Sequence, residues 1–148
     1  MSTEPNGAGD GRFFTHRTAN GLTLLGEYMP SVESISACFY VNTGARDEPA
    51  ALMGVSHFLE HMMFKGTATR DYRAINHAFE AMGAENNAAT SIELTYYYAK
   101  VLSDQAPKLV ELLADMMRPR LDDDDFNQER NVILEEIARY EDIPSFKL

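Results

Sequence analysis

The most constraining feature of the sequence is a short string, His57-Phe58-Leu59-Glu60-His61, inside an apolar segment that runs from Ala50 to Phe64. The segment is long enough for about four helical turns, and Lys65-Gly66 closes it in the manner of a helix C-terminus. The residues around the two histidines and the glutamate are apolar nearly all round, which predicts a buried helix. Buried imidazoles and carboxylates need partners, because without them they cost several kcal/mol.

Zinc is a partner that suits these three residues. On an α-helix His57 and His61 lie one turn apart on the same face, and Glu60 lies about 60° to one side of His57. Two imidazoles at this spacing can bind one ion, and a catalytic zinc site then needs a third protein ligand and an open position for water. Glu60 is placed to accept a proton from that water. The alternative is a metal-free cluster of the three residues within the core.

The third ligand is expected on the last helix, which opens with the acidic run at residues 122–125. With Ile133 set at 0° on a helical wheel, the residues within about 40° define a buried stripe. These residues are Phe126, Ile137 and Tyr140. Glu136 and Glu129 lie about 60° and 40° from that centre, whereas Glu135 lies on the far side. The wheel therefore favours Glu136 over its neighbour Glu135. Two inward carboxylates seven residues apart can act as a ligand and as a group that orients it or the bound water, and we take Glu136 as the ligand and Glu129 as the supporting group. The alternative is that both glutamates flank the stripe as surface residues.

The remaining pattern predicts an α+β fold with a largely antiparallel sheet and helices on one face. Strands are expected at residues 13–17, 22–28, 35–43, 86–91 and 94–102. The pair Asn20-Gly21 predicts a hairpin between the first two. Residues 86–91 are small and polar and residues 94–102 are aromatic and β-branched, which predicts an edge strand beside a better buried neighbour. Further helices are expected at residues 72–82, and from the cap candidate Ser103 to a point before Pro119.

Length and composition narrow the function classes. A chain of 148 residues favours one domain, expected at residues 12–148 after a polar, glycine-rich leader at residues 1–11 that we expect to be disordered. The net charge of −10 argues against nucleic acid as a partner. The sequence contains no stretch of the roughly 18 to 20 apolar residues that a membrane span needs. A single cysteine, Cys38, and the lack of a signal-peptide pattern favour the cytoplasm, with a periplasmic or organellar location left open.

Together the string at residues 57–61 and the pair Glu129 and Glu136 resemble the inverzincin peptidases, the group that includes pitrilysin, insulin-degrading enzyme and the mitochondrial processing peptidase. The resemblance extends from about Gly21 to Tyr140. It implies the metallohydrolase fold of the mitochondrial processing peptidase and a zinc-dependent endopeptidase acting on peptides or small unfolded polypeptides. It also implies one Zn²⁺ held by His57, His61 and Glu136, with Glu60 as general base and Glu129 as a supporting acid.

A second stretch, residues 83–90, is similar to the family's edge strand, along which substrate is held as an added β-strand. The resemblance implies that Asn87, Ala88 and Ala89 contact substrate, with Asn87 near the scissile carbonyl; an ordinary edge strand is the alternative. The chain ends before the first family domain would be complete, so further peptidase domains or a second subunit are expected as partners. The alternative functions are a noncatalytic recognition subunit and an inactive fragment that binds zinc.

Overall fold

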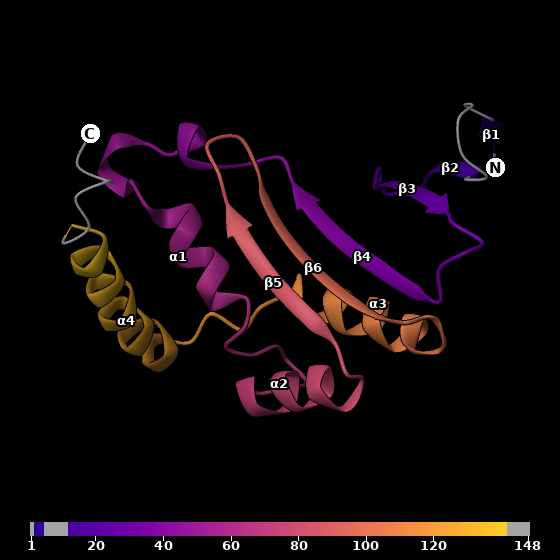
Figure 1. Cartoon of the computed structure of the whole chain (residues 1–148). Coiled ribbons are helices and arrows are strands. Elements are labelled where there is room, and N and C mark those ends of the chain that lie inside the picture. The colour runs from indigo at the N-terminus through magenta and orange to yellow at the C-terminus, as the bar shows by residue number, and fades with distance from the viewer. Residues whose placement is uncertain (1, 5–11, 142–148) are drawn as a thin grey trace. The chain divides into compact units, whose positions relative to one another are not determined.

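The computed structural model describes residues 2–4 and 12–141, and the chain forms two compact units, residues 1–34 and 35–148 (Figure 1). The sequence predicts one domain over residues 12–148, and the boundary between the two units lies inside that range. Each unit is described by itself.

The first unit contains a small antiparallel sheet of three strands in the order β1-β2-β3. These strands are β1 (Ser2–Glu4), β2 (Arg12–Arg17) and β3 (Thr23–Tyr28). The predicted hairpin is confirmed: Gly21 takes a φ of +92° in the turn, and the Thr18 N–H donates to the Leu22 carbonyl at 2.9 Å. Strand β1 falls inside the predicted leader at residues 1–11, of which residues 1 and 5–11 lie outside the described part.

The second unit is built on another three-stranded sheet, ordered β4-β6-β5. Its strands are β4 (Ser34–Val41), β5 (Glu85–Thr90) and β6 (Thr95–Leu102). Strand β6 alternates buried and less buried residues, as a central strand with one covered face should. It pairs with β5 in antiparallel register, with Ala88 opposite Tyr97, and β4 runs opposite to β6 (Figure 1). The prediction that the small, polar strand lies at the sheet edge is confirmed.

Two helices cover one face of this sheet, α2 (Tyr72–Ala81) and α3 (Ala106–Met116). Both lie along the same side of the strands (Figure 1). The core that they form with β6 consists of Ile75, Phe79, Ala99, Val101, Leu109, Leu112, Leu113 and Met116. The predicted α+β architecture, an antiparallel sheet with helices on one face, is therefore confirmed. The expected cap at Ser103 is wrong, because Ser103 begins a 3₁₀ turn and Gln105 precedes the first residue of α3.

The helix that carries the histidines, α1 (Val55–Met62), is shorter than the four turns predicted for residues 50–64. Gly54 interrupts the segment with a φ of +93°, a left-handed conformation that glycine adopts without the steric cost of a Cβ. The Glu48 carboxylate accepts hydrogen bonds from the N–H groups of Gly54 and Ser56, which holds the start of the helix in place. The helix is also less buried than expected, since Leu59 is 41% exposed while Met62 is buried.

The last helix, α4 (Asp123–Glu141), packs against α1. The predicted buried stripe on α4 is only partly correct. Ile133 is 8% exposed, but Phe126 and Ile137 are 46% and 48% exposed, and the side chain of Tyr140 lies outside the described residues. The wheel identified residues that share a face, and α1 covers only part of that face. Among the helices that the structure describes, none is both long and apolar enough to cross a membrane.

Candidate metal centre

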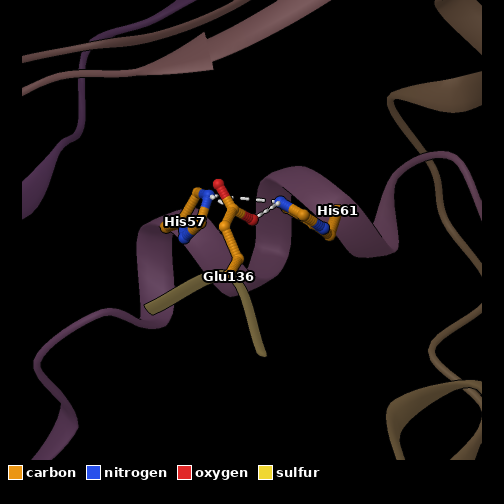
Figure 2. A group of neighbouring side chains, drawn as sticks. All are labelled: His57, His61 and Glu136. Carbon is orange, nitrogen blue, oxygen red and sulfur yellow. Dashed lines mark hydrogen bonds and ion pairs between the residues drawn. The ribbon is translucent and has the colours of Figure 1, made fainter. Parts of the chain in front are cut away.

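Three side chains from two helices converge on one point (Figure 2). His57 and His61 project from α1, and Glu136 reaches them from α4. The two Nε2 atoms of the histidines are 3.1 Å apart. Glu136 Oε2 lies 3.9 Å from His57 Nε2 and 3.6 Å from His61 Nε2. The structure therefore brings together the three residues that the sequence predicts as zinc ligands, although they are separated by up to 79 positions (136 minus 57).

The spacing of these three atoms fits one zinc ion. Ligands placed about 2.0 to 2.1 Å from a tetrahedral ion lie roughly 3.3 Å from one another. The separations of 3.1, 3.6 and 3.9 Å bracket that value. Two imidazole nitrogens and one carboxylate oxygen are also a donor set that zinc takes at catalytic sites. The arrangement can thus hold zinc with small side-chain adjustments.

The two helices that supply these residues are held together by packing beside the site. The rings of Phe58 on α1 and Phe126 on α4 lie with their centroids 4.6 Å apart. Phe58 follows His57 directly in the sequence. This aromatic pair is a direct contact between α1 and α4, and pairs of this kind add to the energy of apolar burial.

A second carboxylate, Glu129, orients one of the histidines. Glu129 is only 4% exposed, and its Oε1 lies 2.8 Å from His61 Nδ1. A carboxylate can only accept, so Nδ1 carries the hydrogen and Nε2 of the neutral ring is left with its lone pair facing the ligand cluster. Glu129 thus occupies the position expected of a residue that supports a ligand.

Lys65 binds the second carboxylate oxygen of Glu129. Its Nζ forms an ion pair with Glu129 Oε2. Burial raises the pKa of the Glu129 carboxyl, but the Lys65 ammonium and the His61 ring N–H outweigh burial and hold that pKa below its ordinary value. Lys65, Glu129 and His61 therefore form a chain of charged and hydrogen-bonded groups that ends at the ligand cluster.

Glu60, the predicted base, lies on the side of α1 that faces strand β5. The Thr90 hydroxyl, at the end of β5, donates to Glu60 Oε2 at 2.5 Å. Nearby, burial and then the negative charge of Glu60 raise the pKa of Tyr97 to about 12. Tyr97 therefore stays protonated across the neutral range.

A pocket extends from His61 to the sheet edge. It is lined by Glu60, His61, Phe64, Lys65, Asn87, Ala88 and Glu129. Two of the residues predicted to contact substrate, Asn87 and Ala88, thus border the same space as the predicted base. Ala89, the third, lies opposite Tyr96 on the sheet face away from Thr90 and is not among the residues that line the pocket. At the edge itself, the Ala88 N–H donates to Asn87 Oδ1 at 2.9 Å.

The sequence analysis did not single out two residues of this neighbourhood, Lys65 and Thr90. Lys65 could have been suspected, because residues 57, 61 and 65 repeat every four positions and so follow one helical stripe. Thr90 left no comparable signal, since its contact with Glu60 joins residues 30 positions apart on a strand and a helix. Glu135, which the wheel set aside, is exposed.

A helix with two histidines around a glutamate, facing a glutamate on a neighbouring helix, is typical of zinc metallopeptidases. The profile of the family described as Insulinase (Peptidase family M16) matches residues 24–147. The chain belongs to peptidase family M16. The resemblance to the inverzincin peptidases is thereby confirmed.

Individual relatives agree with this assignment. An uncharacterized zinc protease of Bacillus subtilis (strain 168) is 44% identical over 126 residues, which is 84% of this chain and 31% of that protein. The beta subunit of the mitochondrial-processing peptidase of Saccharomyces cerevisiae is 41% identical over 123 residues, 82% of this chain and 27% of that protein. The crystal structure of a protease from Helicobacter pylori matches 92% of this chain and 33% of that chain, with a TM-score of 0.87 and 28% identity. The chain thus spans about a third of the length of these relatives.

Proposed function

We propose that the protein is a zinc-dependent endopeptidase in which His57, His61 and Glu136 hold one zinc ion. The observation that carries the proposal is the convergence of these three side chains, whose ligand atoms all lie within 4.8 Å of one another. Glu129 supports it, because a buried carboxylate on the second nitrogen of a zinc-binding histidine is the usual way that such a ligand is oriented. Membership of a family whose relatives are named zinc proteases points the same way.

In this proposal Glu60 is the general base. Zinc, when bound, supplies a Lewis acid that lowers the pKa of water at the site and polarises the peptide carbonyl. Glu60 accepts the proton of the attacking water and returns it to the leaving amine. Its position supports this role, since it neighbours the ligand His61 in the sequence but is held toward β5 rather than into the ligand cluster.

The substrate is proposed to bind as an extended strand along β5, with Asn87, Ala88 and Ala89 as its contacts. Strand β5 is the edge of its sheet, so one side of its backbone has no partner strand among the described residues. The Ala88 N–H points to that open side, because it donates to the side chain of Asn87 rather than to β6. A substrate carbonyl would replace the Asn87 amide as the acceptor. Recognition through the main chain tolerates many sequences, which suits peptides and small unfolded polypeptides as substrates.

Further domains or a second subunit are proposed to complete the enzyme. The chain spans about a third of the length of its relatives, and one of those relatives is named as a subunit. We also retain the cytoplasm as the proposed compartment, on the single cysteine of the chain. Fractionation of cells that produce the natural protein tests this last point directly.

The test is Glu60→Gln in the natural full-length protein, with zinc content and hydrolysis of an internally quenched peptide measured together. The amide keeps the shape of the side chain but cannot take a proton, so zinc should be retained while hydrolysis falls by roughly 100-fold or more. Glu135→Gln, an exposed position on α4, serves as the matched control. Unchanged hydrolysis in Glu60→Gln would refute the assigned base, and absence of stoichiometric zinc in the wild-type protein would refute the metal site.

A further inference from the structure

We infer that Thr90 is a positioning residue that holds the carboxylate of Glu60 in the orientation needed for proton transfer. The inference rests on the proposed function, because it assigns Thr90 a role through Glu60. Its basis is a hydrogen bond in which the Thr90 hydroxyl donates to Glu60 Oε2 at 2.5 Å, between partly buried side chains from β5 and α1.

Glu60 needs a second point of attachment. Helix α1 fixes only the start of its side chain, and three rotatable bonds separate the backbone from the carboxylate. The start of α1 is itself fixed, since Glu48 accepts hydrogen bonds from Gly54 and Ser56. Thr90 binds one carboxylate oxygen, and no hydrogen bond to Oε1 is found among the described residues. One oxygen is therefore held while the other remains open to accept a proton.

The hydroxyl of Thr90 is well placed to act as this anchor because its own surroundings are rigid. Thr90 ends strand β5 directly opposite Thr95, the first residue of β6. The turn between them is closed by hydrogen bonds from Ser91 N–H and Ser91 Oγ to the Leu94 carbonyl, at 2.8 and 2.9 Å. A donor carried by such a tight connection has little freedom to follow the glutamate if it moves.

The hydroxyl of Thr95 lies beside that of Thr90 and acts as the donor in both of its contacts. Thr95 is 6% exposed, and its Oγ1 donates to the Thr43 carbonyl at 3.1 Å while lying 3.5 Å from Thr90 Oγ1. A hydroxyl has one hydrogen, so Thr95 can donate to only one of these acceptors at a time. Whichever acceptor Thr95 uses, Thr90 keeps its own hydrogen for Glu60, which as a carboxylate can only accept.

The strand register also places Thr90 on the sheet face that α1 approaches. In the antiparallel register Thr90 and Ala88 share a face with Tyr97, whereas Asn87 and Ala89 share the opposite face with Tyr98 and Tyr96. The same strand therefore presents an open backbone edge to the proposed substrate and a hydroxyl to the proposed base. The hydrogen bond from Thr90 therefore ties the carboxylate of Glu60 to the strand along which the scissile peptide would lie.

The test compares Thr90→Val, which keeps the shape and removes the hydroxyl, with Thr90→Ser, which keeps the hydroxyl. Both are made in the natural full-length protein and assayed with an internally quenched peptide that the wild type cleaves. Thr90→Val should lower kcat roughly 10- to 100-fold with KM and zinc affinity within about threefold of wild type, because a misplaced base slows chemistry without weakening binding. Thr90→Ser should retain at least about a third of the wild-type kcat. Thr23→Val, at an exposed strand position, is the control.

Three results would overturn the inference: a kcat in Thr90→Val equal to wild type, equal losses in Thr90→Val and Thr90→Ser, or a loss that resides in zinc affinity. If Thr90→Val does not fold, Thr90→Ala replaces it and the same criteria apply. In a Glu60→Gln background, Thr90→Val should cause no further loss, and an additional tenfold loss would contradict a role through Glu60. Failure of the proposed function appears separately, as full activity in Glu60→Gln alone.

Discussion

Replacement of Glu129 by glutamine should weaken zinc binding without removing a ligand. Glu129 Oε1 lies 2.8 Å from His61 Nδ1, so the glutamine can still accept this hydrogen bond but without its negative charge. A hydrogen bond to a charged group contributes about 1.5 to 3 kcal/mol and a neutral one about 1 kcal/mol, which puts the loss near 1 to 2 kcal/mol. Such a loss corresponds to roughly a 5- to 30-fold rise in the Kd for zinc, which overlaps the range found for partners of metal-binding histidines.

The assay is competition for Zn²⁺ between the protein and a chromophoric chelator at neutral pH, in the natural full-length protein. Glu135→Gln removes a carboxylate from an exposed position of the same helix and should leave the Kd unchanged. This control separates the local hydrogen bond from the general effect of lowering the negative charge. A Kd for Glu129→Gln within about threefold of wild type would refute the claim that Glu129 orients His61 for metal binding.

Three other contacts lead to predictions of their own. Lys65→Met should also raise the Kd for zinc severalfold, because it removes the cation beside Glu129. In the double variant with Glu129→Gln it should cause little further change, since both residues act through one network. Additive effects in the same competition assay would argue that Lys65 acts elsewhere. Asp115→Asn should lower the free energy of unfolding at neutral pH by about 1 to 2 kcal/mol. Burial raises the pKa of Asp115, but hydrogen bonds from Arg70, Thr67 and Thr69 hold it below its ordinary value of 3.8. The stabilisation is therefore present above about pH 4 and is lost as the pH falls through the native pKa of Asp115. The melting temperature should thus fall less steeply with decreasing pH for the variant than for the wild type, and parallel falls for the two proteins would contradict this. Gly44→Ala should destabilise the fold by roughly 1 to 3 kcal/mol, because a Cβ there would lie 2.4 Å from the Ser91 carbonyl oxygen. Gly26→Ala, where a Cβ would have nothing within 4 Å, is the control. Equal melting temperatures for the two variants would show that the turn at Ser91 moves to accommodate the methyl group.

The positions of site residues on α1, α4 and β5 are what local sequence predicts well. Helical geometry places residues i, i+3 and i+4 on neighbouring positions whatever the surroundings, so the spacing of His57, Glu60 and His61 is enough to group them. The same reasoning separated Glu129 and Glu136 from Glu135, and the structure places the first two toward α1 and leaves the third exposed. The choice of β5 as the edge strand likewise followed from its small and polar residues.

Local sequence was a poorer guide to where α1 starts and to what covers α4. The start of α1 depends on the left-handed conformation of Gly54 and on the carboxylate of Glu48, a side chain outside the helix. The exposure of Phe126 and Ile137 depends on how much of α4 its neighbour covers. Periodicity identifies residues that share a face, but the area buried on that face is a property of the packed elements.

The sequence by itself therefore determined the class of fold, the chemistry of the proposed metal ligands and the helix faces that carry them, because these depend on residue type and on the regular geometry of single elements. Only the tertiary structure decided that Lys65 neutralises Glu129 and that Thr90 binds Glu60. Both contacts join residues far apart in the chain, 64 positions in the first case (129 minus 65) and 30 in the second. Their distances are set by the packing of α1 against α4 and β5, which no repeat within a single element encodes.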